Sequence, residues 1–222
     1  MNTLTIAPSS RLDSLELPIG GITPLTTVDF PGLLAMVIFL RGCPWRCPYC
    51  HNSSLQSAKP QSDDMTWTQL LSFLTKRRGF LEAVVFSGGE PTQHDNLSHA
   101  LREVRNLGFK TGLHTAGIYP KRLAKLLPLL DWVGLDIKAP LDGRYDRITK
   151  QPQSFVSARK SLSLLMIAGK PFQLRSTRSP EILSSNDCSD LEKDLHTLHA
   201  PRTTWQEAKN CPPARLTCPA LP

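Results

Sequence analysis

The sequence predicts an α/β fold in which parallel strands and helices form a partial, open (β/α)6 barrel. Short apolar runs alternate with stretches of helical periodicity along most of the 222 residues, and such alternation implies parallel strands joined by helical crossovers. The first two runs are almost continuously apolar, which is typical of strands that are buried on both faces. Cysteines, glycines and charged residues follow the ends of the runs, where barrels of this kind carry their chemistry.

Six apolar runs are predicted to be strands. The first two are the clearest because they are rich in Val, Ile and Phe. Six strand–helix units are too few for a closed barrel of eight, so we expect an open one. The predicted strands are Ala35–Leu40, Ala83–Phe86, Lys110–His114, Trp132–Ile137, Phe172–Arg175 and Thr203–Gln206.

Five stretches between these strands are expected to be helices. Thr66 and Gln69 have the spacing of a capping box, and Pro120 suits a first helical turn. Gly108 and Gly169 follow periodic segments and are expected to end them. The five helices are predicted to begin near Thr66, Asp95, Pro120, Ser154 and Asp187, and the last to end near Leu198.

Composition and charge exclude some classes of protein. A chain of 222 residues is long enough for one sizeable core, and no apolar run approaches the ~20 residues of a membrane-spanning helix, so no membrane association is expected. The N-terminus lacks the pattern of a secretion signal, so we expect a cytoplasmic protein. The formal net charge is +7. Because the basic residues are scattered and no nucleic-acid-binding module frames them, we expect a solvated basic surface or an acidic partner, not direct nucleic-acid binding.

Three parts of the chain are expected: an N-terminal extension (1–19), one core domain (20–208) and an irregular tail (209–222). The tail has four prolines in its last eleven residues, which favours irregular structure. Cys211 and Cys218 lie in this tail, where a metal-binding role is left open. Cys188 falls on the apolar face of a predicted helix and is expected in the core.

Three further cysteines lie within eight residues, directly after the first predicted strand. Cys43, Cys47 and Cys50 have the spacing C-x3-C-x2-C in a loop with two prolines. In a reducing compartment such a group indicates a metal site more often than disulfides, and thiolates are preferred ligands of iron–sulfur clusters. Three protein ligands would leave one iron of a four-iron cluster open to a small molecule. The spacing alone also allows zinc, with His51 as a fourth ligand, or no metal.

The motifs around this loop resemble those of the radical S-adenosylmethionine (radical SAM) enzymes. Tyr49 stands just before the last cysteine, and Ser87–Pro91 carries a Gly-Gly-Glu motif after the second strand. The resemblance covers about residues 20–198 and is strongest with one branch, the glycyl-radical-enzyme activases, in particular the activating proteins of anaerobic ribonucleoside-triphosphate reductase. The segments that resemble this branch are Thr23–Gly32, Cys47–Asn52 and Asp136–Pro140.

The resemblance implies a radical SAM core domain that binds a [4Fe–4S] cluster and S-adenosylmethionine. An electron from the cluster would break the sulfonium bond, and the resulting 5′-deoxyadenosyl radical would abstract a hydrogen from a glycine of a partner enzyme. The implied partner is a glycyl radical enzyme, with anaerobic ribonucleoside-triphosphate reductase as the first candidate. The implied electron donor is a reduced flavodoxin or ferredoxin-type protein.

The resemblance also implies roles for residues at strand ends. The three cysteines would be cluster ligands and catalytic residues, the glycines would let the backbone approach the cofactor, and the basic residues would pair with its methionine carboxylate. Each assignment has a structural alternative: a plain turn, a loop anchor, a surface ion pair or a core aromatic. The residues implied to contact S-adenosylmethionine are Tyr49 beside the adenine, Gly88, Gly89 and Glu90, His114 and Thr115 near the ribose or a cation, Asp136, Lys138 and Arg175.

Two other functions are left open. The same radical chemistry could act on a small molecule, such as a deazapurine precursor. The lack of an obvious extra substrate domain suits a large macromolecular partner, but it does not exclude a small substrate. The chain could instead be a non-catalytic binding module for zinc or an iron–sulfur cluster.

Overall fold

The structure, a computed structural model, describes residues 17–208, and residues 1–16 and 209–222 lie outside the described part. The predicted tail with Cys211 and Cys218 is therefore outside it. The described part begins within the core, because Leu17 is buried and the first strand starts at Ile19. The division of the chain into extension, core and tail stays a prediction.

A single sheet of seven strands runs through the described residues in the order β1 to β7. The six predicted strands are all present and mutually parallel, which confirms the predicted fold class. Neither β1 nor β7 pairs with the other, so the sheet is an open, partial barrel. The strands are β1 (Ile19–Thr26), β2 (Ala35–Leu40), β3 (Ala83–Gly88), β4 (Lys110–Thr115), β5 (Trp132–Asp136), β6 (Phe172–Arg178) and β7 (Thr203–Glu207).

Strand β1 was not predicted, and it is the one strand of this sheet that pairs antiparallel with its neighbour. Its sequence contains Gly20, Gly21 and Pro24, which are poor strand formers. An edge strand tolerates them because one side of its backbone needs no ladder partner. Burial of Ile19 and Ile22 then holds the strand in place.

The five predicted helices are present, and Thr66 and Gln69 form the predicted capping box. The last helix begins at Ser185 rather than near Asp187, because Ser184 is the N-cap and Asp187 completes a second capping box from the third position. One short helix, α4, was not predicted. The helices are α1 (Trp67–Lys76), α2 (Leu97–Asn106), α3 (Pro120–Leu126), α4 (Gly143–Thr149), α5 (Ser154–Ala168) and α6 (Ser185–Thr197), with short 3-10 turns η1 (Ser53–Leu55), η2 (Pro91–Gln93) and η3 (Leu127–Leu129).

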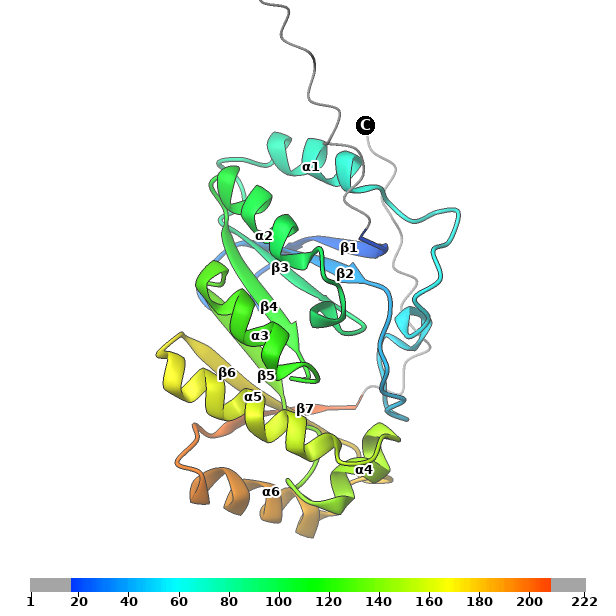
Figure 1. The fold of residues 1–222 in the computed structure, drawn as a ribbon, viewed down its shortest axis with the longest axis vertical. Coiled ribbons are helices and arrows are strands. Elements are labelled where there is room, and N and C mark those ends of the chain that lie inside the picture. Colours follow the sequence, from blue (N-terminus) through cyan, green and yellow to red (C-terminus); the bar gives the residue numbers. More distant parts are fainter. Residues whose placement is uncertain (1–16, 209–222) are drawn as a thin grey trace, which may run out of the picture.

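The main core lies between the sheet and the helices that cover its outer face (Figure 1). Side chains alternate along each strand, so Met36, Ile38 and Leu40 of β2 enter this core while Val37 joins a second, smaller cluster on the inner face. Among the helices of residues 17–208, none covers the inner face, which holds the site described below.

The segment between β1 and β2 closes the amino-terminal end of the inner face. Phe30 packs against Trp132 with ring centroids 5.5 Å apart. A Cβ at Gly112 would lie 3.0 Å from the Phe30 ring, so glycine makes room for this contact. These residues form a packed apolar floor beneath the site.

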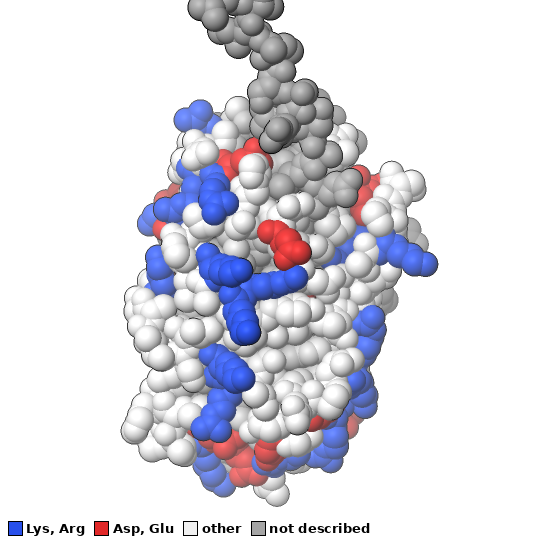
Figure 2. All heavy atoms as spheres, viewed as in Figure 1, with Lys and Arg blue, Asp and Glu red and all other residues white. Residues whose placement is uncertain are grey.

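No helix in residues 17–208 is long and apolar enough to cross a membrane. Figure 2 shows lysine and arginine side chains spread over the face that carries α2, α3 and α5, with acidic side chains gathered at the end where α6 lies. The excess of positive charge is therefore distributed, apart from this acidic end.

Candidate functional site

All predicted site residues except Glu90 line one cavity of about 440 Å³ at the carboxyl ends of the parallel strands. Each strand from β2 to β6 contributes its last residues or the loop that follows, because carboxyl ends of parallel strands meet at one edge. The remaining lining residues are Asp29, Phe39, Trp45, His51, Asn52, Gln56, Ser87, Ala116, Thr177 and Gln206. Most of these were not predicted, and inward alternation along the strands was the available signal for Phe39, Ser87 and Thr177.

The three cysteines of the loop after β2 are partly buried and free. The loop is fixed by backbone hydrogen bonds from Gly42 N to Leu55 O (2.7 Å) and from Cys43 N to Gln56 O (3.1 Å). Burial raises the pKa of the Cys43 thiol to about 12, and burial also raises the pKa of Cys47. A metal group would have to displace the thiol protons, so its binding is coupled to proton release.

The geometry of the loop bears on which metal group it could hold. The loop places the thiols of Cys43, Cys47 and Cys50 in the lining of one cavity of about 440 Å³. A donor set made only of sulfur fits an iron–sulfur cluster, so the residues present fit the group that the sequence implied.

A buried arginine that the sequence did not single out anchors the start of the loop. Arg41 is 4% exposed, and its Nε donates to both carboxylate oxygens of Asp64 at 2.8 and 2.7 Å. Its Nη2 also donates to Gln61 at 2.9 Å. Because Arg41 lies two residues before Cys43, this buried pair sets the position from which the cysteine loop departs.

Two glycines, the last residue of β3 and the one that follows it, allow two backbones to pack together. A Cβ at Gly88 would lie 2.3 Å from the backbone N and O of Leu40, and one at Gly89 would lie 2.2 Å from Gly42 O. Gly88 also has a φ of +117°, a conformation that side chains oppose. We expected the glycines to make room for a ligand, and the structure shows that neighbouring backbone already requires them.

Glu90 is buried, is not among the residues that line the cavity, and joins the ends of β3 and β4. Its Oε1 accepts hydrogen bonds from Thr115 Oγ1 (2.6 Å), Thr92 Oγ1 (2.5 Å) and Thr92 N (3.1 Å). Its Oε2 accepts from Ala116 N at 2.9 Å. Burial raises the pKa of Glu90, and these hydrogen bonds oppose that rise. Of the roles considered for Glu90, its position matches the loop anchor.

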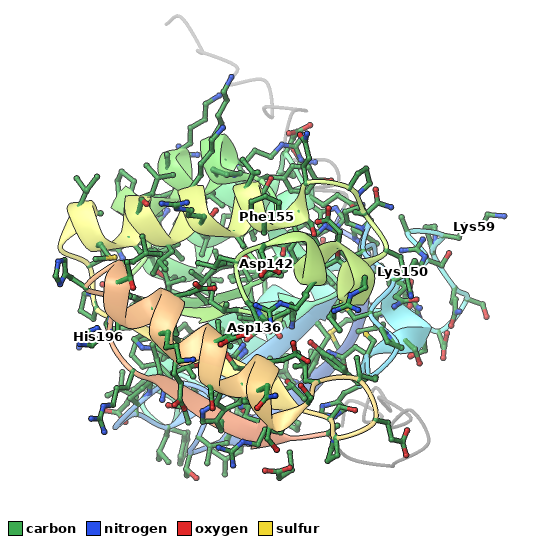
Figure 3. All side chains as sticks on the ribbon, turned by 90° about the horizontal axis from the view of Figure 1, so that it is seen from below. Lys59, Asp136, Asp142, Lys150, Phe155 and His196 are labelled. Atoms are coloured by element: carbon green, nitrogen blue, oxygen red, sulfur yellow. The ribbon has the colours of Figure 1, made fainter. Side chains whose placement is uncertain are left out.

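A basic residue just after β5 and one in the middle of β6 share one carboxylate. Arg175 was expected to end its strand, but β6 continues to Arg178. Lys138 Nζ lies 2.9 Å from Asp136 Oδ2, and Arg175 Nη2 lies 2.8 Å from Asp136 Oδ1. Burial raises the pKa of Asp136, but Arg175 and Lys138 outweigh it and hold that pKa well below its usual range. The charged triad therefore carries a net charge of +1, and Figure 3 shows Asp136 near the middle of the molecule in the view from below.

His114 and Thr115, at the end of β4, contact this triad and the Glu90 anchor. Arg175 Nη1 lies 3.1 Å from the His114 ring nitrogens. Burial and the Arg175 charge lower the pKa of His114 to about 4, so the imidazole is neutral at pH 7. The Thr115 hydroxyl donates to Glu90 and accepts from Gly117 N at 2.9 Å.

Two tyrosines hold the backbone of Lys138. The Tyr49 hydroxyl donates to Lys138 O at 3.2 Å, and the hydroxyl of the fully buried Tyr145 accepts from Lys138 N at 3.2 Å. Tyr145 also packs edge-on against Trp45 of the cysteine loop, with ring centroids 5.7 Å apart. The cysteine loop and the triad are thus connected directly. No pattern in the sequence pointed to Tyr145, because it lies in the unpredicted helix α4.

Comparison with known proteins places this site in a family. The model of the radical SAM superfamily matches residues 37–176. A Methanocaldococcus jannaschii protein with the provisional name glycyl-radical enzyme activating enzyme is 30% identical over 205 residues, which are 85% of this chain and 82% of that protein. The pyruvate formate-lyase-activating enzyme of Clostridium pasteurianum is 33% identical over 136 residues, 59% of this chain and 56% of that enzyme. The chain thus spans little more than half of the latter.

Solved structures with a similar fold include that of TYW1 with a lysine-pyruvate adduct bound. Its TM-score is 0.59, its sequence is 15% identical, and the match covers 82% of this chain and 66% of TYW1. Another is anSMEcpe with bound AdoMet and a peptide, with a TM-score of 0.55 and 17% identity over 75% of this chain and 48% of that one. At such identities the likeness concerns the fold. Since the family match runs from β2 into β6, the chain belongs to the radical SAM superfamily and is an enzyme of that superfamily.

Proposed function

We propose that this enzyme holds a [4Fe–4S] cluster on Cys43, Cys47 and Cys50 and binds S-adenosylmethionine in the adjoining cavity. The observation that carries the proposal is the meeting of three thiols with Lys138 and Arg175 in one cavity of about 440 Å³. Thiolates suit the cluster, and the two cations suit the carboxylate of the methionine moiety.

The cluster, when bound, would supply the electron that cleaves the sulfonium bond to give a 5′-deoxyadenosyl radical. The chain's own residues have the task of positioning the cofactor. The net charge of +1 on the triad of Asp136, Lys138 and Arg175 would be neutralised by one ligand carboxylate. The planar fork of Arg175 would fix the carboxylate orientation. His114 stays neutral beside the triad and adds no repulsion toward a sulfonium cation.

We infer that the radical is directed at a glycine of a partner glycyl radical enzyme. Similarity to the M. jannaschii protein over most of both chains and to pyruvate formate-lyase-activating enzymes supports this partner class. The segments Thr23–Gly32 and Asp136–Pro140 favour anaerobic ribonucleoside-triphosphate reductase as the partner. A reduced flavodoxin or ferredoxin-type protein is the proposed electron donor.

The test begins with anaerobic reconstitution of the protein with iron and sulfide. After reduction in the presence of S-adenosylmethionine, chromatography should detect 5′-deoxyadenosine. Addition of anaerobic ribonucleoside-triphosphate reductase should then give a glycyl radical in electron paramagnetic resonance, and pyruvate formate-lyase should give a weaker signal or none.

Two outcomes would contradict different parts of the proposal. A protein with a full cluster that releases no 5′-deoxyadenosine would overturn the proposed cofactor chemistry. Release of 5′-deoxyadenosine without a radical on either partner would overturn the activase assignment and direct attention to a small-molecule substrate.

A further inference from the structure

Helix α5 carries apolar side chains on two opposite faces. One face, with Ala158, Leu162 and Leu165, packs into the main core. At 3.6 residues per turn, Val156 and Ile167 lie on the opposite face of the helix, and Ile167 is 84% exposed. A surface helix normally places polar residues on the side away from the core. The outer face of α5 is therefore more apolar than contact with water alone would require.

A groove of about 580 Å³ runs along this outer face and the neighbouring helix α3. The two helices pack against each other, and Ser161 Oγ of α5 donates to Gly117 O, just before α3, at 2.8 Å. These contacts fix the spacing of the helices and so the shape of the groove. The apolar part of its lining comes from both helices: Pro120, Ala124, Phe155, Val156, Leu164 and Ile167.

The charged residues that line the groove are all basic. Lys121, Arg159 and Lys160 line it, and among residues 17–208 no Asp or Glu does. Neither α3 nor α5 contains an acidic residue anywhere along its length. The carboxylate beside the start of α5, that of Asp146, is already engaged by Ser154 N and Oγ, both at 2.8 Å. Figure 2 shows lysine and arginine side chains over the surface where these helices lie. The groove therefore combines an apolar lining with positive charge.

We propose that the groove between α3 and α5 docks an acidic amphipathic helix of a partner protein. Helix-in-groove recognition uses apolar anchors at i, i+3 or i+4, and i+7 on one face of the incoming helix. Such anchors would contact the apolar side chains of both α3 and α5. Glutamates or aspartates beside the anchors would meet Lys121, Arg159 and Lys160, and charge complementarity of this kind favours the correct partner.

Two other occupants fit the groove less well. In a symmetric dimer the same surface meets itself, so the basic side chains of the groove would face those of the second copy. A flat anionic lipid surface would reach a projecting side chain such as Ile167, but it could not enter the groove. An acidic helix is convex and opposite in charge, so it satisfies both requirements.

A helix docked here would leave the cavity free. Helices α3 and α5 lie on the outer side of the sheet (Figure 1), whereas the cavity opens on the inner face. Among the described residues, none lines both the groove and the cavity. The docked helix would therefore not compete with S-adenosylmethionine, and the proposal does not depend on the proposed function.

The experiment compares two matched double variants of the reconstituted enzyme. Lys160→Glu with Ile167→Ser changes the groove. Lys110→Glu with Phe80→Ser is the control, because it also reverses one lysine and removes one exposed apolar side chain, but near the amino ends of β3 and β4. All four residues are exposed, so both variants should fold like the original protein. Circular dichroism and thermal unfolding check this.

The main probe is a stapled, fluorescent peptide of about 16 residues, because free helices below ~12–15 residues are marginal in water. It carries leucines at i, i+4 and i+7 with glutamates beside them. A second peptide has the same composition with the leucines spread around the helix. Fluorescence anisotropy should show that the patterned peptide binds the groove variant about 10-fold more weakly than the original protein, through loss of one apolar contact and one charge pair. The control variant should bind like the original, and added salt should weaken binding.

Several outcomes would overturn the proposal. They are equal affinity of the patterned peptide for all three proteins, no binding of it to the original protein, and equal binding of the two peptides. Binding to phosphatidylserine vesicles without peptide binding would replace the acidic helix with a membrane surface. A dimer in sedimentation that the groove variant loses would replace it with a second copy. Release of 5′-deoxyadenosine should be equal in the three proteins, and its absence from all of them would contradict the proposed function while the docking result stands.

Discussion

The two halves of the inner face of the sheet are built in opposite ways. Toward the amino ends of the strands, Phe30, Val37 and Trp132 pack into an apolar floor. Toward the carboxyl ends, the same face carries Asp136 and Arg175 around the cavity. On β5 the change from Trp132 to Asp136 takes four residues. The comparison shows that an apolar floor can hold strands in register so that charged groups converge above it.

The halves also differ in the contacts that stabilise them. The apolar floor depends on close packing of its side chains, whereas the polar half depends on specific hydrogen bonds and ion pairs. No buried side-chain nitrogen or oxygen in residues 17–208 lacks a hydrogen-bond partner, although the polar half concentrates charge. Substitutions should therefore be more costly in the polar half than in the floor, because an unpaired buried charge costs more than a small change in packing.

The largest effect is expected from Cys47→Ala. Two remaining thiolates should hold the cluster poorly, so iron content and release of 5′-deoxyadenosine should fall further than the ~10–100-fold typical of an outer-shell metal partner. Iron and sulfide analysis after anaerobic reconstitution measures it. Cys188→Ala, on α6 outside the site, is the matched control. It should keep its iron content and its release of 5′-deoxyadenosine. A full iron complement in Cys47→Ala would contradict the ligand assignment.

Asp136→Asn should be the most destabilising change in the triad. It leaves Lys138 and Arg175 without their shared carboxylate. Because these side chains are 14–27% exposed, the loss in free energy of unfolding should lie below the ~3–5 kcal/mol of a fully buried pair. Denaturant unfolding measures the loss. Trp132→Phe, in the floor, should cost about 1 kcal/mol as a change of shape in a packed cluster. If Asp136→Asn and Trp132→Phe lowered the free energy of unfolding equally, the polar half would not be more sensitive to substitution than the floor.

Lowering the pH should reduce the free energy of unfolding, because His114 in the polar half is neutral in the folded protein. Its pKa is about 4 in the folded protein and 6.5 as the ordinary value, so the unfolded chain binds more protons between these pH values. Stability should therefore fall from pH 6.5 to pH 4, by up to about 3 kcal/mol. Asp136, whose pKa is lowered, stays ionised in this window. His114→Gln should show a shallower pH dependence of unfolding, and an unchanged slope would contradict the assignment.

Gly89→Ala and Gly112→Ala test the same added methyl group in the two halves. At Gly89 the Cβ would lie 2.2 Å from Gly42 O, which is backbone, and at Gly112 it would lie 3.0 Å from side chains of Phe30 and Val85. Gly89→Ala should cost about 2 kcal/mol and reduce cluster loading, because backbone cannot yield easily. Gly112→Ala should cost less, since side chains can shift. Thermal unfolding and iron content measure both, and the reverse order would contradict the packing described.

The smallest effect is expected from Tyr145→Phe. Loss of the hydroxyl leaves Lys138 N without its partner, at a cost of about 1 kcal/mol. S-adenosylmethionine should bind more weakly to the reconstituted variant by calorimetry, while iron content stays unchanged. Tyr119→Phe is the matched control, because the structure places no hydrogen bond from Tyr119 to the triad. Unchanged affinity in Tyr145→Phe would show that Lys138 does not depend on this contact.

The sequence by itself determined the six parallel strands, five of the helices and the cysteine loop. These features depend on periodicity and on ligand spacing within a few residues, which can be read along the chain. It also pointed to the strand ends, which is why Asp136, Lys138 and Arg175 are all predicted site residues, although the sequence did not predict that Asp136 pairs with both cations.

Tertiary structure decided the pairings. Arg41 meets Asp64 across 23 residues, Glu90 meets Thr115 across 25, and Arg175 meets Asp136 across 39. Strand β1 likewise exists because β2 offers it a partner. Such contacts have no local signal, because a hydrogen bond or ion pair depends on distance in space, and the folded sheet alone brings these groups together. The sequence therefore predicted which residues form the candidate site, and the fold determined which of its charged groups pair with one another.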